Sequence, residues 1–187
     1  MFRLALFASG SGTNVQNICE YFQNHNSIKP EIVLSDKKDA YALERAKRLN
    51  IKSEYFNYIT TSSEVLLEKI KHHKVTHIIL AGYLRLVPSK IIKTFKNKIL
   101  NIHPSLLPKF GGKGFYGHHV HKSVLESNEQ ESGITIHLVN EKYDEGKILF
   151  QKSTPIFDND DVASLSSRIH NLEYKYYPQI IEKYLLN

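Results

Sequence analysis

Short apolar runs alternate along this chain with longer segments in which apolar residues recur every three or four positions. Runs of about four to eight apolar or β-branched residues are typical of buried strands, and the longer spacing is typical of helices that bury one face. Strands are predicted at residues 3–8, 31–35, 52–56, 76–81, 98–100, 132–139 and 147–151. Helices are predicted at residues 15–22, 40–49, 89–96, 118–125 and 162–186, with another that begins at a cap formed by Thr61 or Ser62.

The order of these elements predicts an α/β fold. Strands and helices alternate through roughly the first hundred residues, which is typical of a doubly wound, mostly parallel sheet flanked by helices, with a Rossmann-like N-terminal half. The strands at 132–139 and 147–151 are separated by a polar loop and predict a hairpin-like pair. A chain of 187 residues favours one domain over two, so we expect a single domain across residues 1–187.

The composition is that of an ordinary globular protein, with 41% hydrophobic and 24% charged residues. One cysteine, Cys19, excludes an internal disulfide and a cysteine-cluster metal site. The sequence also shows no signal peptide and no membrane-spanning run. Together with the single cysteine, this absence favours a reducing, cytoplasmic location. The net charge of +6 is spread along the chain and favours anionic ligands. No RNA-binding signature is present, so we expect small-molecule substrates and neither nucleic acid nor a membrane, with monomer and homodimer both open.

A glycine-rich turn at residues 9–14 joins the first strand to the first helix. Free backbone N–H groups and the positive end of a helix dipole make such a turn suitable for an anion. Val15 occupies the third glycine position of a dinucleotide fingerprint, and no Gly-Lys-Ser/Thr follows, so the turn fits neither NAD nor a Walker A loop. The phosphate of a small molecule is the better fit. The alternative is a tight turn with Thr13 as a helix cap.

The sequence Asn101-Ile-His-Pro follows directly on a predicted strand. Two residues apart in a strand, Asn101 and His103 share one face at its carboxyl end, where open α/β sheets bind ligands. An amide can hold a developing oxyanion, and an imidazole can pass a proton near neutral pH. The pair therefore suits acyl transfer. The alternative is that His103 only ends the strand and Asn101 caps a turn.

Two loops could complete this site. Residues 83–88 form an exposed apolar loop with one arginine, which could hold a flat, partly apolar ligand, or could pack Leu84, Leu86 and Val87 under the next helix. Asp144 lies in the polar loop 140–146, where it could be a solvated loop acid. As a carboxylate beside an imidazole, it could instead fix the tautomer and raise the pKa of the histidine.

Three histidines, His118, His119 and His121, open the predicted helix at 118–125. His119 and His121 do not face the same way on a helix, and no nearby carboxylate completes a ligand set. We therefore predict no metal site and expect polar helix-start residues, one of which could line the site.

Five motifs in one order carry a family resemblance. They lie at residues 9–14, 81–85, 101–108, 133–137 and 144–146. Together they resemble the folate-dependent formyltransferases, specifically the phosphoribosylglycinamide formyltransferase family, over nearly the whole chain. The resemblance implies metal-free transfer of a formyl group from the co-substrate 10-formyltetrahydrofolate to the amine of glycinamide ribonucleotide (GAR), in de novo purine biosynthesis. The amine would attack directly and form a tetrahedral intermediate.

The same resemblance implies roles for individual residues. Asn101 is expected to be the oxyanion donor, His103 to transfer the proton, and Asp144 to hold His103 and elevate its pKa. The phosphate and ribose of GAR are expected at Gly12, Thr13, Asn14 and Glu173. Folate is expected at Leu84, Arg85, Leu86, Val87 and Asn101.

The implied organisation is a phosphate-binding half at about residues 1–100 and a catalytic and folate-binding half at about 101–187. Two departures concern the loop at residues 111–117, which is longer than in the shortest family members, and residues 57–62, which lack an arginine that some relatives carry near the folate tail. How the tail is held is therefore open. The alternative activity is another folate-dependent formyltransferase, or a formyltetrahydrofolate hydrolase, using the same Asn-His-Asp centre.

Overall fold

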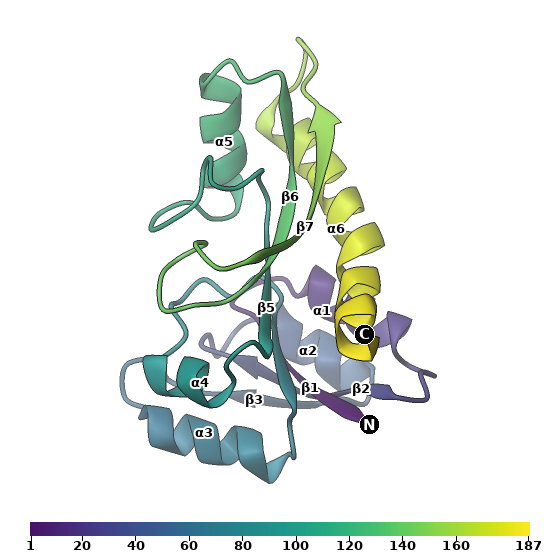
Figure 1. Cartoon of the computed structure of the whole chain (residues 1–187), viewed down its shortest axis with the longest axis vertical. Helices are drawn as coiled ribbons and strands as arrows, with labels where there is room; N and C mark the ends of the chain where they lie inside the picture. The colour runs from purple at the N-terminus through teal and green to yellow at the C-terminus, as the bar shows by residue number, and fades with distance from the viewer.

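A seven-stranded sheet of order β3-β2-β1-β4-β5-β6-β7 runs through the molecule (Figure 1). The structure is a computed structural model that describes all residues 1–187. The strands are β1 (Phe2–Phe7), β2 (Ile28–Ser35), β3 (Lys52–Tyr55), β4 (His77–Leu80), β5 (Ile99–His103), β6 (Glu131–Leu138) and β7 (Ile148–Pro155). The first five pair in parallel, and β6 and β7 are antiparallel. The predicted α/β fold with a mostly parallel sheet is confirmed.

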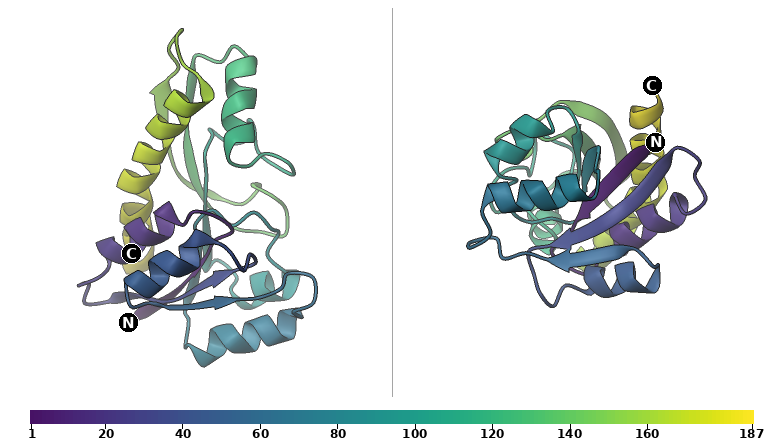
Figure 2. Two further views of the ribbon diagram at one scale, coloured as in Figure 1. Left: turned by 180° about the vertical axis from the view of Figure 1, so that it is seen from behind. Right: turned by 90° about the horizontal axis from the view of Figure 1, so that it is seen from below.

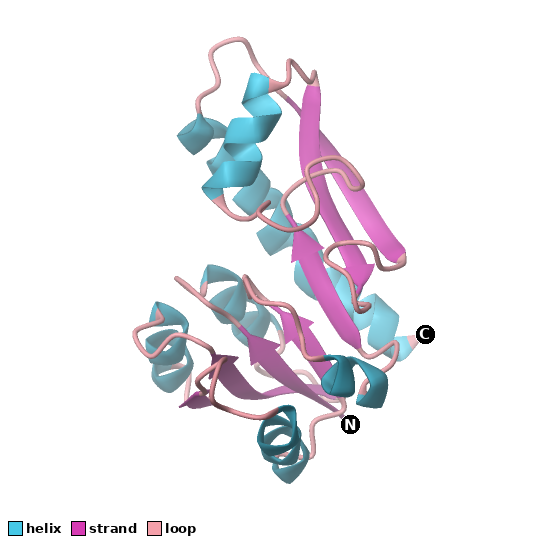
Figure 3. Cartoon of the chain, turned by 90° about the vertical axis from the view of Figure 1, so that its left-hand side faces the viewer, coloured by secondary structure: helices cyan, strands magenta, loops and turns pink.

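Helices cover both faces of this sheet (Figure 2). They are α1 (Thr13–Tyr21), α2 (Tyr41–Arg48), α3 (Ser63–His72), α4 (Ser89–Thr94), α5 (His118–Glu126) and α6 (Val162–Leu186). Helices α1, α2, α5 and α6 contact one another on one face, and α3 packs beside α4 on the other. The sheet twists strongly, so that β1–β3 run crosswise to β6 and β7 in Figures 1 and 3. None of the helices combines the length and the apolar composition needed to cross a membrane.

The central strand β1 divides its side chains between two hydrophobic cores. Leu4 and Leu6 pack in the core beneath α1, α2 and α6, and Ala5 and Phe7 pack in the core beneath α3 and α4. Alternation of side chains along a strand produces this division. Because both faces are buried, the strand is apolar throughout, which explains why its sequence shows a continuous run and no polar alternation.

The chain reverses its direction of travel across the sheet between β1 and β4. From β1 it moves outward through β2 to β3, and the connection through α3 then returns it to β4 on the opposite side of β1. The loops that follow the carboxyl ends of β1 and β4 therefore diverge and leave a crevice between them. Ligands of open α/β sheets bind at such a crevice.

The last helix, α6, ties this region together. Asp161 caps it, because Ser164 N donates to Asp161 Oδ1 over 2.7 Å while Asp161 N donates to Ser164 Oγ over 3.0 Å. Further along, the fully buried hydroxyl of Tyr177 lies 2.9 Å from Leu80 O and 3.1 Å from Leu100 O. One side chain thus links the helix to the end of β4 and the start of β5.

We predict that Tyr177→Phe lowers the free energy of unfolding by about 1–3 kcal/mol, because two buried carbonyl groups lose their shared donor. Urea unfolding would measure the change. Tyr184→Phe is the matched control: it also removes a hydroxyl of α6 that donates to a backbone carbonyl, Asn97 O, but on the exposed surface. Equal losses in the two variants would contradict the importance of the buried link.

Candidate functional site

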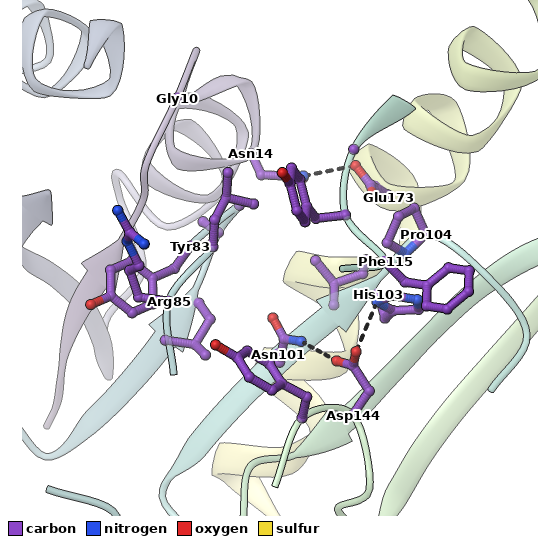
Figure 4. Close-up of a pocket in the computed structure, with 18 of the residues that line it drawn as sticks. Gly10, Asn14, Tyr83, Arg85, Asn101, His103, Pro104, Phe115, Asp144 and Glu173 are labelled. Carbon is purple, nitrogen blue, oxygen red and sulfur yellow. Dashed lines mark hydrogen bonds and ion pairs between the residues drawn. The ribbon is translucent and has the colours of Figure 1, made fainter. Parts of the chain in front are cut away.

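A cavity of about 410 Å³ opens at the crevice between β1 and β4 and extends along β5 (Figure 4). Loops after β1, β4 and β5 line it, together with the glycine-rich loop before α5, the loop between β6 and β7, and one face of α6. The cavity brings together every site residue predicted from the sequence: Gly12, Thr13, Asn14, Leu84, Arg85, Leu86, Val87, Asn101, His103, Asp144 and Glu173.

The loop after β1 presents the N-terminus of α1 to the cavity. Gly12 is the N-cap, with φ of 74°, and a Cβ there would lie 2.4 Å from Ala42 Cα. Only glycine fits this close approach of α1 to α2. Thr13 is the first helical residue and forms no cap, so the alternative interpretation of Thr13 as a helix cap is wrong. Backbone N–H groups at the helix start are available to an anion.

Glu173 faces this loop from α6. Asn14 Nδ2 donates to Glu173 Oε2 over 2.8 Å, and only 6% of Glu173 is exposed (Figure 4). Burial raises the pKa of Glu173 to about 7, although the hydrogen bond from Asn14 acts to lower it. The carboxyl group therefore keeps its proton to a higher pH than an exposed glutamate does, and in its protonated form it can both donate to and accept from a ligand hydroxyl.

The loop after β4 is tied to the ends of β1 and β2. Ser9 Oγ donates to Asp36 Oδ1 over 2.6 Å and accepts from Leu84 N over 3.0 Å. Arg85 Nε donates to the other oxygen of Asp36 over 3.2 Å, so the charge of Arg85 is already paired. Val87 is 2% exposed and packs in the core, as one alternative expected, whereas Leu84 is 45% exposed at the cavity.

Asn101, His103 and Asp144 converge on the opposite side of the cavity (Figure 4). Asn101 and His103 both lie in β5, and Asp144 approaches from the loop between β6 and β7. His103 Nδ1 lies 3.5 Å from Asp144 Oδ2, and His103 Nε2 donates to Phe110 O over 2.7 Å. Gly112 N donates to Asp144 Oδ2 over 2.9 Å. The glycine-rich loop before α5, residues 109–117, therefore holds both His103 and Asp144 through its backbone.

The expectation that Asp144 elevates the pKa of His103 is wrong, because this pKa is lowered in the structure. Burial lowers this pKa below its ordinary value, and this effect outweighs the opposing influence of Asp144 and the carbonyl of Phe110. Burial also acts to raise the pKa of Asp144. His137, His103 and the amide of Gly112, all within 3.6 Å, nevertheless hold that pKa below its ordinary range. Because both pKa values are lowered, His103 is a neutral imidazole beside the ionised carboxylate of Asp144 at neutral pH.

His137 belongs to this centre, although no role was assigned to it from the sequence. It lies directly opposite Asn101 in the antiparallel pairing of β5 with β6, and it is 2% exposed. Its Nε2 is 3.1 Å from Asn101 Nδ2 and 3.6 Å from Asp144 Oδ1. Its presence in the motif at residues 133–137 was the available signal. The sequence alone does not give the register that places it opposite Asn101.

The turn after β5 is held by a neighbouring residue of β6. Thr135 Oγ1 accepts from Leu107 N over 3.0 Å and donates to Ser105 O over 2.7 Å. Gln151 of β7 donates to Leu107 O and to Thr135 Oγ1, both over 2.9 Å. These bonds fix the backbone immediately after His103.

The three clustered histidines separate in space. The rings of His118 and His119 lie 4.0 Å apart, whereas His121 is 2% exposed and lines the cavity. No group of three or more His, Cys, Asp or Glu side chains is arranged to hold a metal ion.

A family model described as formyl transferase matches residues 2–181. A phosphoribosylglycinamide formyltransferase of Arabidopsis thaliana is 40% identical over 96% of this chain, and one of Haemophilus influenzae is 36% identical over 97%. The chain spans 64% of the Arabidopsis protein, 60% of a Vigna unguiculata relative and 86% of the Haemophilus protein. The solved glycinamide ribonucleotide transformylase 1 of Geobacillus kaustophilus superposes with a TM-score of 0.90 at 34% identity, and the match covers 100% of both chains.

The buried Glu173 generates a prediction about stability. Its pKa rises from 4.5 to about 7 on folding, so the folded protein holds a proton that the unfolded chain releases between these values. Stability should therefore fall as pH rises through this interval, with a full penalty of about 3 kcal/mol above pH 7.

The variant Glu173→Gln has no ionisable group at this position and should lack this pH-dependent loss of stability. Relative to the unmodified protein, the variant should gain stability progressively from pH 4.5 to 7 and show no gain below that range. Urea unfolding at a series of pH values would measure the difference. A constant difference across the range would show that Glu173 does not titrate in this way.

Proposed function

This chain belongs to the formyl transferase family, and we propose that it transfers a formyl group from 10-formyltetrahydrofolate to the amine of glycinamide ribonucleotide, within purine biosynthesis. The observation that carries the proposal is the placement of Asn101, His103 and Asp144 across one cavity from an anion-binding helix start. The names of the relatives support glycinamide ribonucleotide as the formyl acceptor.

Each substrate has a matching part of the cavity in this proposal. The phosphate of the nucleotide binds the backbone at Gly12, Thr13 and Asn14, where helix α1 begins. Glu173 contacts a ribose hydroxyl, to which its carboxyl group can donate when protonated and from which it can accept. The formyl folate lies against the loop after β4, where the exposed Leu84 offers an apolar surface and backbone groups can read the edge of a flat ring.

The reaction begins with attack of the amine nitrogen on the formyl carbon. A carbon–nitrogen bond forms, and the carbonyl electrons move to oxygen to give a tetrahedral intermediate. The bond to the folate nitrogen then breaks, and the proton lost by the attacking amine is transferred to that nitrogen. Atoms and charge balance without a covalent enzyme intermediate.

The side chains supply proton transfer and charge stabilisation. Because His103 Nε2 donates to Phe110 O, the free nitrogen of the neutral ring is Nδ1, beside Asp144. Nδ1 takes the proton from the amine, and the resulting imidazolium is stabilised by Asp144 on one side and by the carbonyl of Phe110 on the other. Asn101 and the imidazolium stabilise the oxyanion.

A spectrophotometric formyl-transfer assay tests the proposal. The purified protein is combined with 10-formyltetrahydrofolate, with and without glycinamide ribonucleotide. We expect turnover only when the nucleotide is present. Folate turnover without it would instead support a hydrolase, and binding of both ligands without turnover would overturn the enzymatic function.

His103→Ala and Asn101→Ala should each lower kcat by on the order of 10²–10³, because each removes a group that acts on the intermediate. His72→Ala is the control, since His72 is exposed at the end of α3 and outside the cavity. Steady-state kinetics would give kcat and KM for all three variants. Full activity of His103→Ala would rule out the proposed proton transfer.

A further inference from the structure

His137 is a buried titratable group of the site that the proposed mechanism leaves without a role. It stands at the centre of the site, across the β5–β6 pairing from Asn101. Its two ring nitrogens make different contacts: Nδ1 lies 2.9 Å from Leu138 O, and Nε2 lies 3.1 Å from Asn101 Nδ2. These two distances determine where its proton resides.

A carbonyl oxygen accepts hydrogen bonds only, so Nδ1 of His137 must carry hydrogen to bond Leu138 O. An amide nitrogen donates only, so Nε2 must accept the N–H of Asn101. Both requirements are met by one species, the neutral imidazole with hydrogen on Nδ1. Leu138 belongs to β6, which is paired with β5 on one side and β7 on the other, so its carbonyl is held in place.

This arrangement fixes which end of the Asn101 amide meets the ligand. The nitrogen of Asn101 faces His137 and, at 3.5 Å, Asp144 Oδ1. The amide oxygen points into the cavity (Figure 4). An oxyanion needs an N–H, so the amide must make a half-turn before it can stabilise the intermediate.

We propose that His137 is a positioning residue that sets the orientation of the Asn101 amide. With hydrogen on Nδ1 alone, His137 holds the amide nitrogen and turns the oxygen toward the cavity, where it accepts from the substrate amine. In the half-turn, the amide gives up its bond to Nε2 and directs its N–H groups toward the oxyanion, while the hydrogen of His137 stays on Nδ1. The effect of this orientation on catalysis rests on the proposed function. The hydrogen position of His137 and the resulting orientation of the Asn101 amide do not.

The structural part is tested by NMR on the ligand-free, ¹⁵N-labelled protein. The ¹⁵N shifts and couplings of a histidine ring show which nitrogen carries hydrogen, and His137→Gln assigns the signals. We expect hydrogen on Nδ1 of His137 and none on Nε2. Hydrogen on Nε2 in the free protein would overturn the proposal, whether or not the protein transfers formyl groups.

The functional part is tested by a double-mutant cycle of Asn101→Ala and His137→Phe. If His137 acts through Asn101, His137→Phe should lower kcat by about tenfold or more alone, but by less than about twofold in the Asn101→Ala background. KM for both substrates should change little. Equal losses in both backgrounds would overturn the proposal.

His137→Gln separates positioning from packing. Its side-chain oxygen can accept the N–H of Asn101, which phenylalanine cannot do, so this variant should recover part of the activity that His137→Phe loses. Urea unfolding of all variants identifies any that do not fold. Equal activity of folded His137→Gln and His137→Phe would contradict the positioning role.

Discussion

The proposed catalytic centre depends on the contacts of the Asp144 carboxylate. Within 3.6 Å it meets His103, His137, Asn101 and the backbone of Gly112, which come from β5, β6 and the glycine-rich loop. A buried negative charge is costly unless several partners compensate it. Those partners are therefore held around Asp144, and their side chains are ordered before a ligand arrives. Asp144 itself adopts a positive φ of 56°, which turns its side chain back toward β5.

Hydrogen bonds from several elements hold the scaffold around the site where chemistry is proposed. β5 is paired on both sides, and Thr135 fixes the turn that follows it. Tyr177 secures the end of β4 and the start of β5 from the opposite direction. The hydrogen bonds from the glycine-rich loop to His103 and Asp144 use its backbone groups, while its Phe115 side chain lines the cavity beside them.

The sequence was sufficient for the elements and for the residues that line the cavity. Apolar runs identified the inner parallel strands, and the spacing of Asn101 and His103 placed both on one face of β5. Two properties depended on tertiary structure. The pKa of His103 follows from burial, which the spacing to Asp144 does not show. The contact of His137 with Asn101 follows from strand register, which is set by pairing partners more than thirty residues apart.

The hydrogen bonds of Ser9 carry a consequence for ligand binding. Ser9 begins the loop that leads to the proposed anion site, and its hydroxyl accepts from Leu84 N in the loop on the other side of the crevice. A molecule that orders either loop also restricts the other. Occupancy at the two subsites should thus be thermodynamically linked, and such linkage is reciprocal: each ligand strengthens retention of the other by the same factor. A buried serine hydroxyl would then favour a ternary complex over either binary one.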